Sequence, residues 1–268
     1  MKPRTIQLLL LLSVLSAAVP ALAWTQALRD GADGAMVPLT WETPAFMYSI
    51  SARGSDDMEP ARVEEAVDAA FRTWQEVPCA GVRFEKTSPA TVDEVAAHTD
   101  RGNVNLIVFR EEVEEWHWEL SAVAQTVIHY DGEGRIADVD IEINGAFFTF
   151  ADLSSAGTDA GAYDLRSVLT HEIGHALGLD HSADESAVMY GATAAGNIFR
   201  DLSADDEEGI CSLYPASAAA ENIPEPLCGL DLDGTSSSCA TQADVAETVD
   251  GCGLAPLSRQ VHSLFSLL

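Results

Sequence analysis

The chain has 268 residues, of which 47% are hydrophobic and 21% charged, a composition typical of a folded globular protein. It carries 43 acidic and 14 basic side chains, for a formal net charge of -29. Because a surface of that sign repels a phosphate backbone, nucleic-acid binding is excluded. Cations, calcium above all, and basic or neutral polypeptides are suitable partners, although the acidity is equally consistent with a role in solubility alone.

Residues 1–23 have the pattern of a secretory signal peptide. Two basic residues precede an apolar run over 6–19, and Ala21-Leu22-Ala23 is typical of a cleavage site. We therefore predict cleavage before Trp24 and a secreted protein. The apolar run is too short and too closely followed by a processing site to be a membrane anchor, and no later stretch predicts a transmembrane segment.

The mature chain divides into a domain and a tail. Residues 24–215 are interpreted as one domain, 216–226 as a linker of small residues and proline, and 227–268 as a cysteine-containing C-terminal tail of open role. Export would place the five cysteines in an oxidising compartment, where disulfides form. Because five is odd, at least one thiol must stay free or find another partner.

Hydrophobic periodicity predicts two long helices and a sheet. Apolar residues recur on one face of a helix over 60–74, whose first residue, a proline, suits the first turn. The segments 104–109, 123–130 and 136–143 have the composition of strands. A second helix should begin after Asp164, which is a suitable N-cap. This order predicts an α+β domain in which two long helices pack on a mixed sheet.

The segment 136–143 alternates apolar and acidic residues. A period of two places Asp138, Asp140 and Glu142 on one face of a strand. Clustered carboxylate oxygens are suitable calcium ligands, but a solvated acidic strand face explains the pattern equally well. Calcium is therefore one of two interpretations of this strand.

The second helix carries the motif HEIGHALGLDH. Four residues apart on a helix, His171 and His175 project from the same face and can bind one metal ion. Gly178 is suited to end the helix, because glycine adopts positive φ without strain, and the turn that follows can return His181 to the same ion. Three imidazoles with an open fourth position are typical of catalytic zinc, beside which Glu172 is placed to act as general base.

This motif resembles the extended zinc-binding sequence of the metzincins, and the run SAVMY around Met189 is similar to the turn beneath their metal. Ser182 after the third histidine, Tyr190 after the methionine, and the segment 202–215 resemble the matrixins, the matrix-metalloproteinase type of catalytic domain. The resemblance covers about 41–215. It implies a zincin-like domain with a twisted mixed sheet, two long helices and a small C-terminal subdomain, and it implies zinc-dependent endopeptidase activity.

The resemblance also implies how a polypeptide substrate would bind. The substrate would lie extended beside an edge strand, here 121–126, with its backbone paired across the cleft. Residues 188–199 would wall the pocket for the side chain that follows the cut bond. That pocket usually favours a hydrophobic residue, and its depth stays open here. Met189 would support the metal site without binding the metal.

Other features depart from the matrixin pattern. The family's structural zinc site uses several histidines, whereas the comparable strand positions here hold Gln125 and Asp140, so a second zinc is not expected. His117 and His129 could bind metal, but a surface or strand histidine is the simpler interpretation. No cysteine-bearing segment precedes the domain, which predicts secretion without a thiol that blocks the zinc.

One disulfide is expected, between Cys79 after the first helix and Cys211 in the segment that resembles the closing helix. It would leave Cys228, Cys239 and Cys252, one of them unpaired. Closing so long a loop would stabilise the fold by about 4 kcal/mol in the chain-entropy model.

The function predicted from the sequence is zinc-dependent peptide hydrolysis by a secreted monomer. One alternative is a non-catalytic zinc-binding adhesion or scaffold protein with the same fold. Glu172 argues against it, because a purely structural site does not need that carboxylate. A second alternative is a zinc hydrolase of a non-peptide amide or a glycan, which only a panel of substrates would separate from a peptidase.

Overall fold

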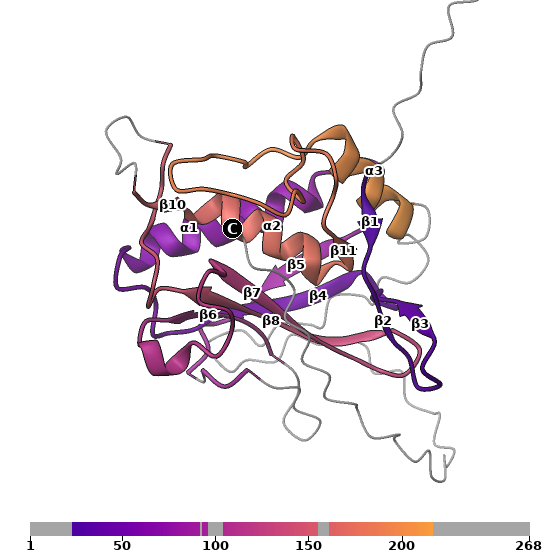
Figure 1. Ribbon diagram of the computed structural model, residues 1–268, viewed down its shortest axis with the longest axis horizontal. Helices are drawn as coiled ribbons and strands as arrows, with labels where there is room; N and C mark the ends of the chain where they lie inside the picture. Colours follow the sequence, from indigo (N-terminus) through magenta and orange to yellow (C-terminus); the bar gives the residue numbers. More distant parts are fainter. Residues whose placement is uncertain (1–22, 92, 96–103, 155–160, 217–268) are drawn as a thin grey trace, which may run out of the picture.

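The computed structural model describes residues 23–91, 93–95, 104–154 and 161–216 (Figure 1). The predicted signal peptide up to residue 22, nearly all of the predicted linker and the C-terminal tail with its three cysteines lie outside these ranges. Within them, no helix combines the length and the apolar composition needed to cross a membrane.

A five-stranded sheet in the order β5-β4-β6-β8-β7 forms the centre of the domain (Figure 1). Strand β4 (Ala45–Ile50) pairs in parallel with β5 (Arg83–Lys86) and with β6 (Asn105–Arg110), and β6 pairs in parallel with β8 (Ile136–Asn144). Strand β7 (Ala124–Tyr130) is antiparallel to β8 and forms an edge. The predicted mixed sheet is confirmed.

Two long helices, α1 (Pro60–Gln75) and α2 (Leu165–Ala176), cover one face of this sheet (Figure 1). Two indole N–H groups donate to backbone carbonyls of α2: Trp74 of α1 to Thr170, at 2.8 Å, and Trp41 to Ala176, also at 2.8 Å. The apolar face predicted for the first helix is the buried one, and it consists of Val63, Ala66, Val67, Ala70, Phe71 and Trp74.

Nearly every residue of α2 is buried, because the helix lies between α1, the sheet and the described segment that follows His181 (Figure 1). Its amphipathic pattern is therefore weaker than that of α1. The predicted N-cap is confirmed: the carboxylate of Asp164 accepts a hydrogen bond from the Ser167 backbone N–H.

The remaining elements are short. The N-terminal strand β1 pairs with β11, the strand that directly precedes His181. The Trp24 backbone N–H donates to the carboxylate of Asp205 at 3.0 Å, so the start of the domain contacts its end. These elements are β1 (Thr25–Gln26), β2 (Leu28–Asp30), β3 (Met36–Pro38), the 3-10 helix η1 (Val113–Glu115), β9 (Phe150–Ala151), β10 (Tyr163–Asp164), β11 (Leu179–Asp180) and α3 (Ala204–Leu213).

Helix α3 closes the domain and is fastened to it covalently. Cys211 in α3 is bonded to Cys79, which follows α1, with 5.4 Å between their Cα atoms. The expected disulfide is thus confirmed. The hydroxyl of Tyr214 donates to the carbonyl of Leu177 at the end of α2 and accepts from the Trp41 backbone N–H, at 2.7 and 3.1 Å. The small C-terminal subdomain is therefore tied to the helix that carries the histidine motif.

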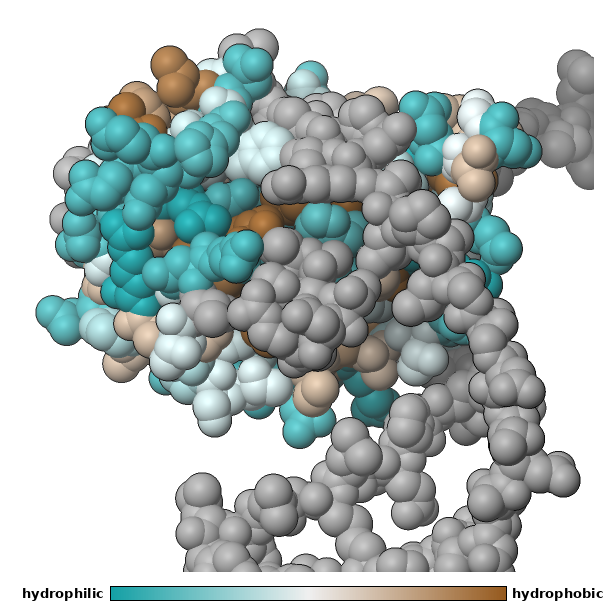
Figure 2. Space-filling model, turned by 90° about the horizontal axis from the view of Figure 1, so that it is seen from below, coloured by the Kyte–Doolittle hydropathy of each residue, from teal (hydrophilic) through white to brown (hydrophobic). Residues whose placement is uncertain are grey.

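Figure 2 shows the molecule from the side of the sheet that faces away from the helices. Hydrophilic residues gather on one part of this face, and apolar residues lie between them near its centre. The concentration of hydrophilic residues agrees with the acidic composition of the chain.

Candidate metal centre

The histidine motif lies where α2 ends and the chain turns into β11. Gly178 makes this turn at φ +91°, and a Cβ atom there would collide with the carbonyl oxygen of Leu39. Only glycine fits both the conformation and the space. The turn carries the chain back along α2, so that His181, just after β11, reaches His171 and His175.

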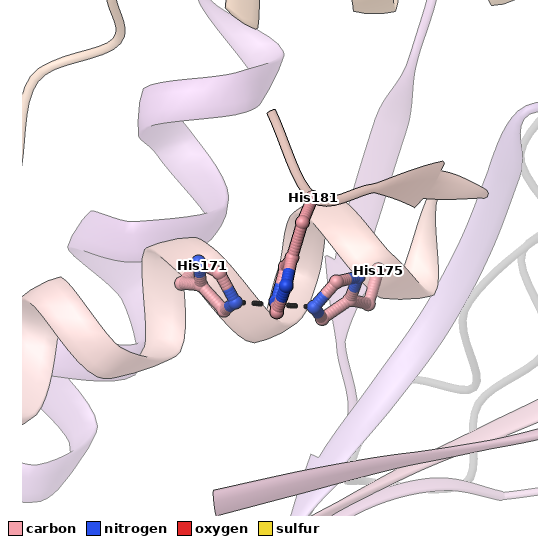
Figure 3. A group of neighbouring side chains, drawn as sticks. All are labelled: His171, His175 and His181. Carbon is pink, nitrogen blue, oxygen red and sulfur yellow. Dashed lines mark hydrogen bonds between the residues drawn. The ribbon is translucent and has the colours of Figure 1, made fainter. Parts of the chain in front are cut away.

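The three imidazoles converge on one point (Figure 3). The Nε2 atoms of His171 and His175 are 3.1 Å apart, and the ring of His181 lies 5.1 Å, centre to centre, from each of the other two rings. Two nitrogens bound to one tetrahedral zinc lie about 3.3 Å apart when each Zn–N bond is about 2.0–2.1 Å long. The spacing of the histidines therefore fits a single zinc ion.

Backbone carbonyls fix the orientation of two of these rings. The Nδ1 atom of His171 donates to the carbonyl of Val188 at 2.7 Å, and that of His175 to the carbonyl of Leu179 at 2.9 Å. The Nε2 lone pair of each ring is thereby left for a metal. Burial lowers the pKa of all three histidines, that of His181 to about 3. Neutral imidazoles are the form that binds metal.

Glu172 is buried beside this centre and is held by the edge strand. The hydroxyl of Thr126, on β7, donates to Oε2 of Glu172 at 2.6 Å. Burial raises the pKa of Glu172 to about 7, and the hydrogen bonds from Thr126 oppose that rise. A carboxylate with a pKa near neutrality can both accept and release a proton. Sequence reasoning missed Thr126, because only the packing of β7 on α2 brings it to Glu172.

Met189 packs against the underside of α2. A Cβ atom on Gly174 would collide with its sulfur, so the motif needs glycine here for close contact. The backbone N–H groups of Val188 and Met189 donate to the carboxylate of Asp206, on α3, at 2.8 and 3.0 Å. Asp206 also forms a capping box with Ser203. Asp206 was missed as a site residue, because its place in the first turn of α3 predicts a helix cap but not its contact with Val188 and Met189.

A second group of potential ligands lies on β7 and β8. His129 is paired with Asp138 across the two strands, and Asp140 completes the group, with ligand atoms within 4.8 Å of one another. Among the described residues, neither carboxylate oxygen of Asp138 has a hydrogen-bond partner, and the side chain is 0% exposed. One oxygen of Asp140 accepts from the Leu106 backbone N–H at 2.9 Å. Burial raises the pKa of Asp138 to about 7 and that of Asp140 well above its usual value.

The solvated acidic face considered for this strand is wrong. Asp138, Asp140 and Glu142 are all buried. Glu142 does not join the group on β7 and β8; it forms an ion pair with Arg110 and accepts from the Trp118 indole at 3.0 Å. His117 is not a member of either potential metal group in the described part of the chain.

Comparison with known proteins agrees with this geometry. The family model for Matrixin matches residues 40–215. The chain belongs to the matrixin family. Both the predicted family and the α+β zincin-like fold are confirmed, and the histidine triad of this matrixin fits the zinc dependence of the family.

This matrixin is similar to matrix metalloproteinases from animals and to metalloendoproteinases from a plant. Matrix metalloproteinase-19 of Mus musculus is 28% identical in an alignment over 222 residues that covers 73% of this chain and 38% of the relative. Macrophage metalloelastase of Oryctolagus cuniculus is 31% identical over 189 residues, 69% of this chain and 36% of the relative. Metalloendoproteinase 1-MMP of Arabidopsis thaliana is 43% identical over 74 residues, 28% of this chain and 20% of the relative. The matrixin thus spans less than two fifths of the length of each of these relatives.

Proposed function

We propose that this matrixin is a zinc-dependent endopeptidase in which His171, His175 and His181 bind the zinc and Glu172 is the general base. The observation that carries the proposal is a buried carboxylate with a raised pKa directly beside three converging neutral imidazoles. Met189 and Gly178 support the site by packing and by the turn, without binding the metal.

Each residue then has a role in hydrolysis. A bound zinc polarises the peptide carbonyl and lowers the pKa of a water molecule next to it. Glu172 accepts a proton from the attacking water, whose oxygen bonds to the carbonyl carbon, and delivers that proton to the amine nitrogen as the C–N bond breaks. Thr126 holds the Glu172 side chain in place during both transfers. An extended substrate would pair its backbone with β7, which is an edge strand.

The alternatives considered from the sequence predict other behaviour. A non-catalytic zinc-binding adhesion or scaffold protein does not need Glu172 or the hydrogen bond that Thr126 donates to it. A zinc hydrolase of a non-peptide amide or glycan would use the same residues but does not need an edge strand beside the metal. The edge strand therefore favours a peptide substrate.

The decisive experiment is hydrolysis of a mixed peptide library by the purified protein beside its Glu172→Ala variant. Glu185→Ala is a matched control, because Glu185 is an exposed glutamate in the segment that follows the zinc motif. The parent and the control should make the same chelator-sensitive cuts, and Glu172→Ala should retain zinc and lose at least about 100-fold in rate. Equal rates for Glu172→Ala and the parent would remove the proposed base.

We also propose that the protein is exported, is cleaved before Trp24 and acts as a monomer. The Cys79–Cys211 disulfide supports export, since such bonds persist in oxidising compartments. N-terminal sequencing of the secreted product and its hydrodynamic size test these points. A product that retains residues 1–23, or a stable dimer, would contradict them.

A cation between β7 and β8 is a further part of this proposal. When the two buried carboxyl groups of Asp138 and Asp140 ionise, they need a compensating positive charge, and a divalent ion would provide it. Calcium was one of two interpretations of this strand. Glu142 is paired with Arg110, so the third ligand that we propose is His129, and an imidazole ligand also suits a transition metal. Metal analysis should give two ions per parent chain and one for Asp138→Asn. A single ion in both would refute the second site.

A further inference from the structure

A cavity lies between the two long helices, near their N-terminal ends. It encloses about 120 Å³ and is lined by residues of α1, by the first two residues of α2, by the segment that follows β9 and by Arg200. A water molecule needs about 10–15 Å³ of such space, so a ligand of a few non-hydrogen atoms fits. Arg166, which lines the cavity, lies five positions before His171 and hence about 140° away around the helix axis. The cavity therefore lies on a different side of α2 from the zinc ligands.

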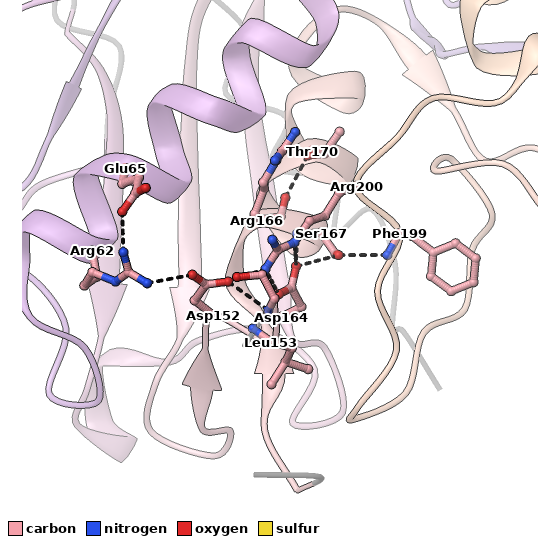
Figure 4. Close-up of polar contacts among 11 residues, drawn as sticks. Arg62, Glu65, Asp152, Leu153, Asp164, Arg166, Ser167, Thr170, Phe199 and Arg200 are labelled. Atoms are coloured by element: carbon pink, nitrogen blue, oxygen red, sulfur yellow. Dashed lines mark hydrogen bonds and ion pairs between the residues drawn. The ribbon is translucent and has the colours of Figure 1, made fainter. Parts of the chain in front are cut away.

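The charged groups in the wall of this cavity do not balance. The described residues that line it include three arginines, Arg62, Arg166 and Arg200, and two acidic residues, Glu65 and Asp152. Arg62 forms ion pairs with both carboxylates, at 2.6 Å with Glu65 and at 2.9 Å with Asp152 (Figure 4). Arg200 also forms an ion pair with Asp152, at 2.6 Å. The positive charge of Arg166 is left without a carboxylate partner among the described residues.

Arg166 differs in this respect from the other partly buried arginines. Its Nη2 atom donates to Oγ1 of Thr73 on α1 at 3.2 Å, whereas its Nε atom is buried and has no hydrogen-bond partner in the described part of the chain. The other described arginines that are not exposed all form ion pairs with carboxylates; they are Arg29, Arg110 and Arg200. A buried donor without a protein partner indicates a position where a water molecule or an ion binds. Since the unmatched group is a cation, the fitting ligand is an anion.

We propose that this cavity binds a small carboxylate, whose oxygens accept hydrogen bonds from the guanidinium group of Arg166. Both groups are planar, and they can form two parallel hydrogen bonds. Charge distinguishes a carboxylate from a tetrahedral oxyanion such as sulfate. The single negative charge of a carboxylate balances the single charge of Arg166, whereas the second charge of sulfate would be repelled by Glu65 and Asp152.

The bound carboxylate would stabilise the packing of α2 on α1. Arg166 already donates to Thr73 across the two helices, and a ligand that binds only the folded state raises the stability of that state. The carboxylate can come from a free organic acid or from an acidic side chain of another polypeptide. Binding at this site does not depend on the proposed endopeptidase function.

The test is calorimetric titration of the purified protein with sodium acetate, together with its melting temperature in acetate and in chloride at equal ionic strength. So small a ligand should bind with a Kd on the order of 1 mM and should raise the melting temperature. Arg166→Gln should weaken acetate binding at least about 10-fold, because it removes the charged donor. Arg72→Gln is the matched control, since Arg72 is exposed on α1 and loses the same charge without lining the cavity. It should bind acetate as the parent does.

A pair of blocked tripeptides with a central aspartate or asparagine distinguishes the two sources of the carboxylate. Binding of the aspartate peptide at least about 10-fold tighter than acetate would indicate a polypeptide, and binding no tighter than acetate would indicate a free acid.

Three results would overturn the proposal. They are a parent that does not bind acetate, an Arg166→Gln variant that binds it as the parent does, and a parent that binds sulfate more tightly than acetate. Should Arg166→Gln not fold, Arg166→Lys keeps the charge without the planar donor pair and should still bind acetate more weakly than the parent. None of these measurements uses hydrolysis, so their outcome is separate from that of the peptide library.

Discussion

The Glu172 carboxylate receives a hydrogen bond from Thr126, which lies 46 residues earlier in the chain. Replacing Thr126 by valine keeps the shape of the side chain and its suitability for a strand but removes the donor. A hydrogen bond to a charged group contributes about 1.5 kcal/mol or more, so we expect kcat to fall at least about 10-fold, with little change in KM or in zinc content. Thr126→Ser should restore most of the rate. A variant that loses zinc along with activity would assign Thr126 a structural role instead.

Which site residues the sequence could predict depends on how local their placement is. The placement of His171 and His175 on one face is predicted by helical spacing. The return of His181 to the same site is predicted by the turn at Gly178, which only glycine can make. Two other contacts join distant segments, so no local pattern reveals them. They are the hydrogen bond from Thr126 to Glu172 and the hydrogen bond from the Met189 backbone N–H to Asp206.

Among the helices and strands, α2 is stabilised by charged side chains at its N-terminus. Hydrogen bonds from Arg200 hold the pKa of Asp152 below its usual value. Burial acts to raise the pKa of Asp164, but the bonds from Arg200, Ser167 and backbone amides outweigh it, so that this pKa is also lowered. A carboxyl group with a lowered folded-state pKa stabilises the fold above its unfolded pKa of about 4 and loses that contribution as the pH falls through the folded value.

We therefore expect Arg200→Gln to lower the free energy of unfolding by about 2 kcal/mol at pH 7, discounted because Asp152 is partly exposed. The gap between parent and variant should close on acidification below about pH 4. Urea unfolding of both proteins across this range measures it, and loss of zinc in acid affects both equally. A gap that widened in acid would contradict the assignment of Arg200 to these carboxylates.

The elements themselves were predictable where one periodicity dominates. The buried face of α1 and the strands β6, β7 and β8 follow from apolar spacing. For the acidic residues of β8, the interpretation as a solvated face was wrong. Alternation with apolar residues predicts that acidic side chains share one face of a strand, but not whether water reaches that face. Asp138 is buried, which only the folded structure shows.

In the whole molecule, one covalent bond joins segments 132 residues apart. The double substitution Cys79→Ser with Cys211→Ser releases α3 from the end of α1 and should lower the free energy of unfolding by about 4–5 kcal/mol in the chain-entropy model. Denaturant unfolding measures this loss, with the exposed neighbour Ser212→Ala as control. An unchanged midpoint would mean that the hydrogen bonds of Tyr214 suffice to hold α3.

The strand order is the part of the fold that the sequence did not supply. Four of the five strands are parallel neighbours joined by long connections, and their order in space differs from their order in the chain. Local propensity says nothing about which strands pair across such distances. The strand order is instead implied by the family, because the short motif around the histidines identifies the matrixins and their common fold.

The indole groups of Trp41 and Trp74 both donate to carbonyls of the helix that bears His171 and His175. Tryptophan emission is sensitive to hydrogen bonding and to solvent, so these two rings are built-in optical probes of that helix. Adding a chelator should change the intrinsic fluorescence as soon as the helix loosens, and restoring zinc should reverse the change. Metal loading can thus be followed in real time without a label or a substrate.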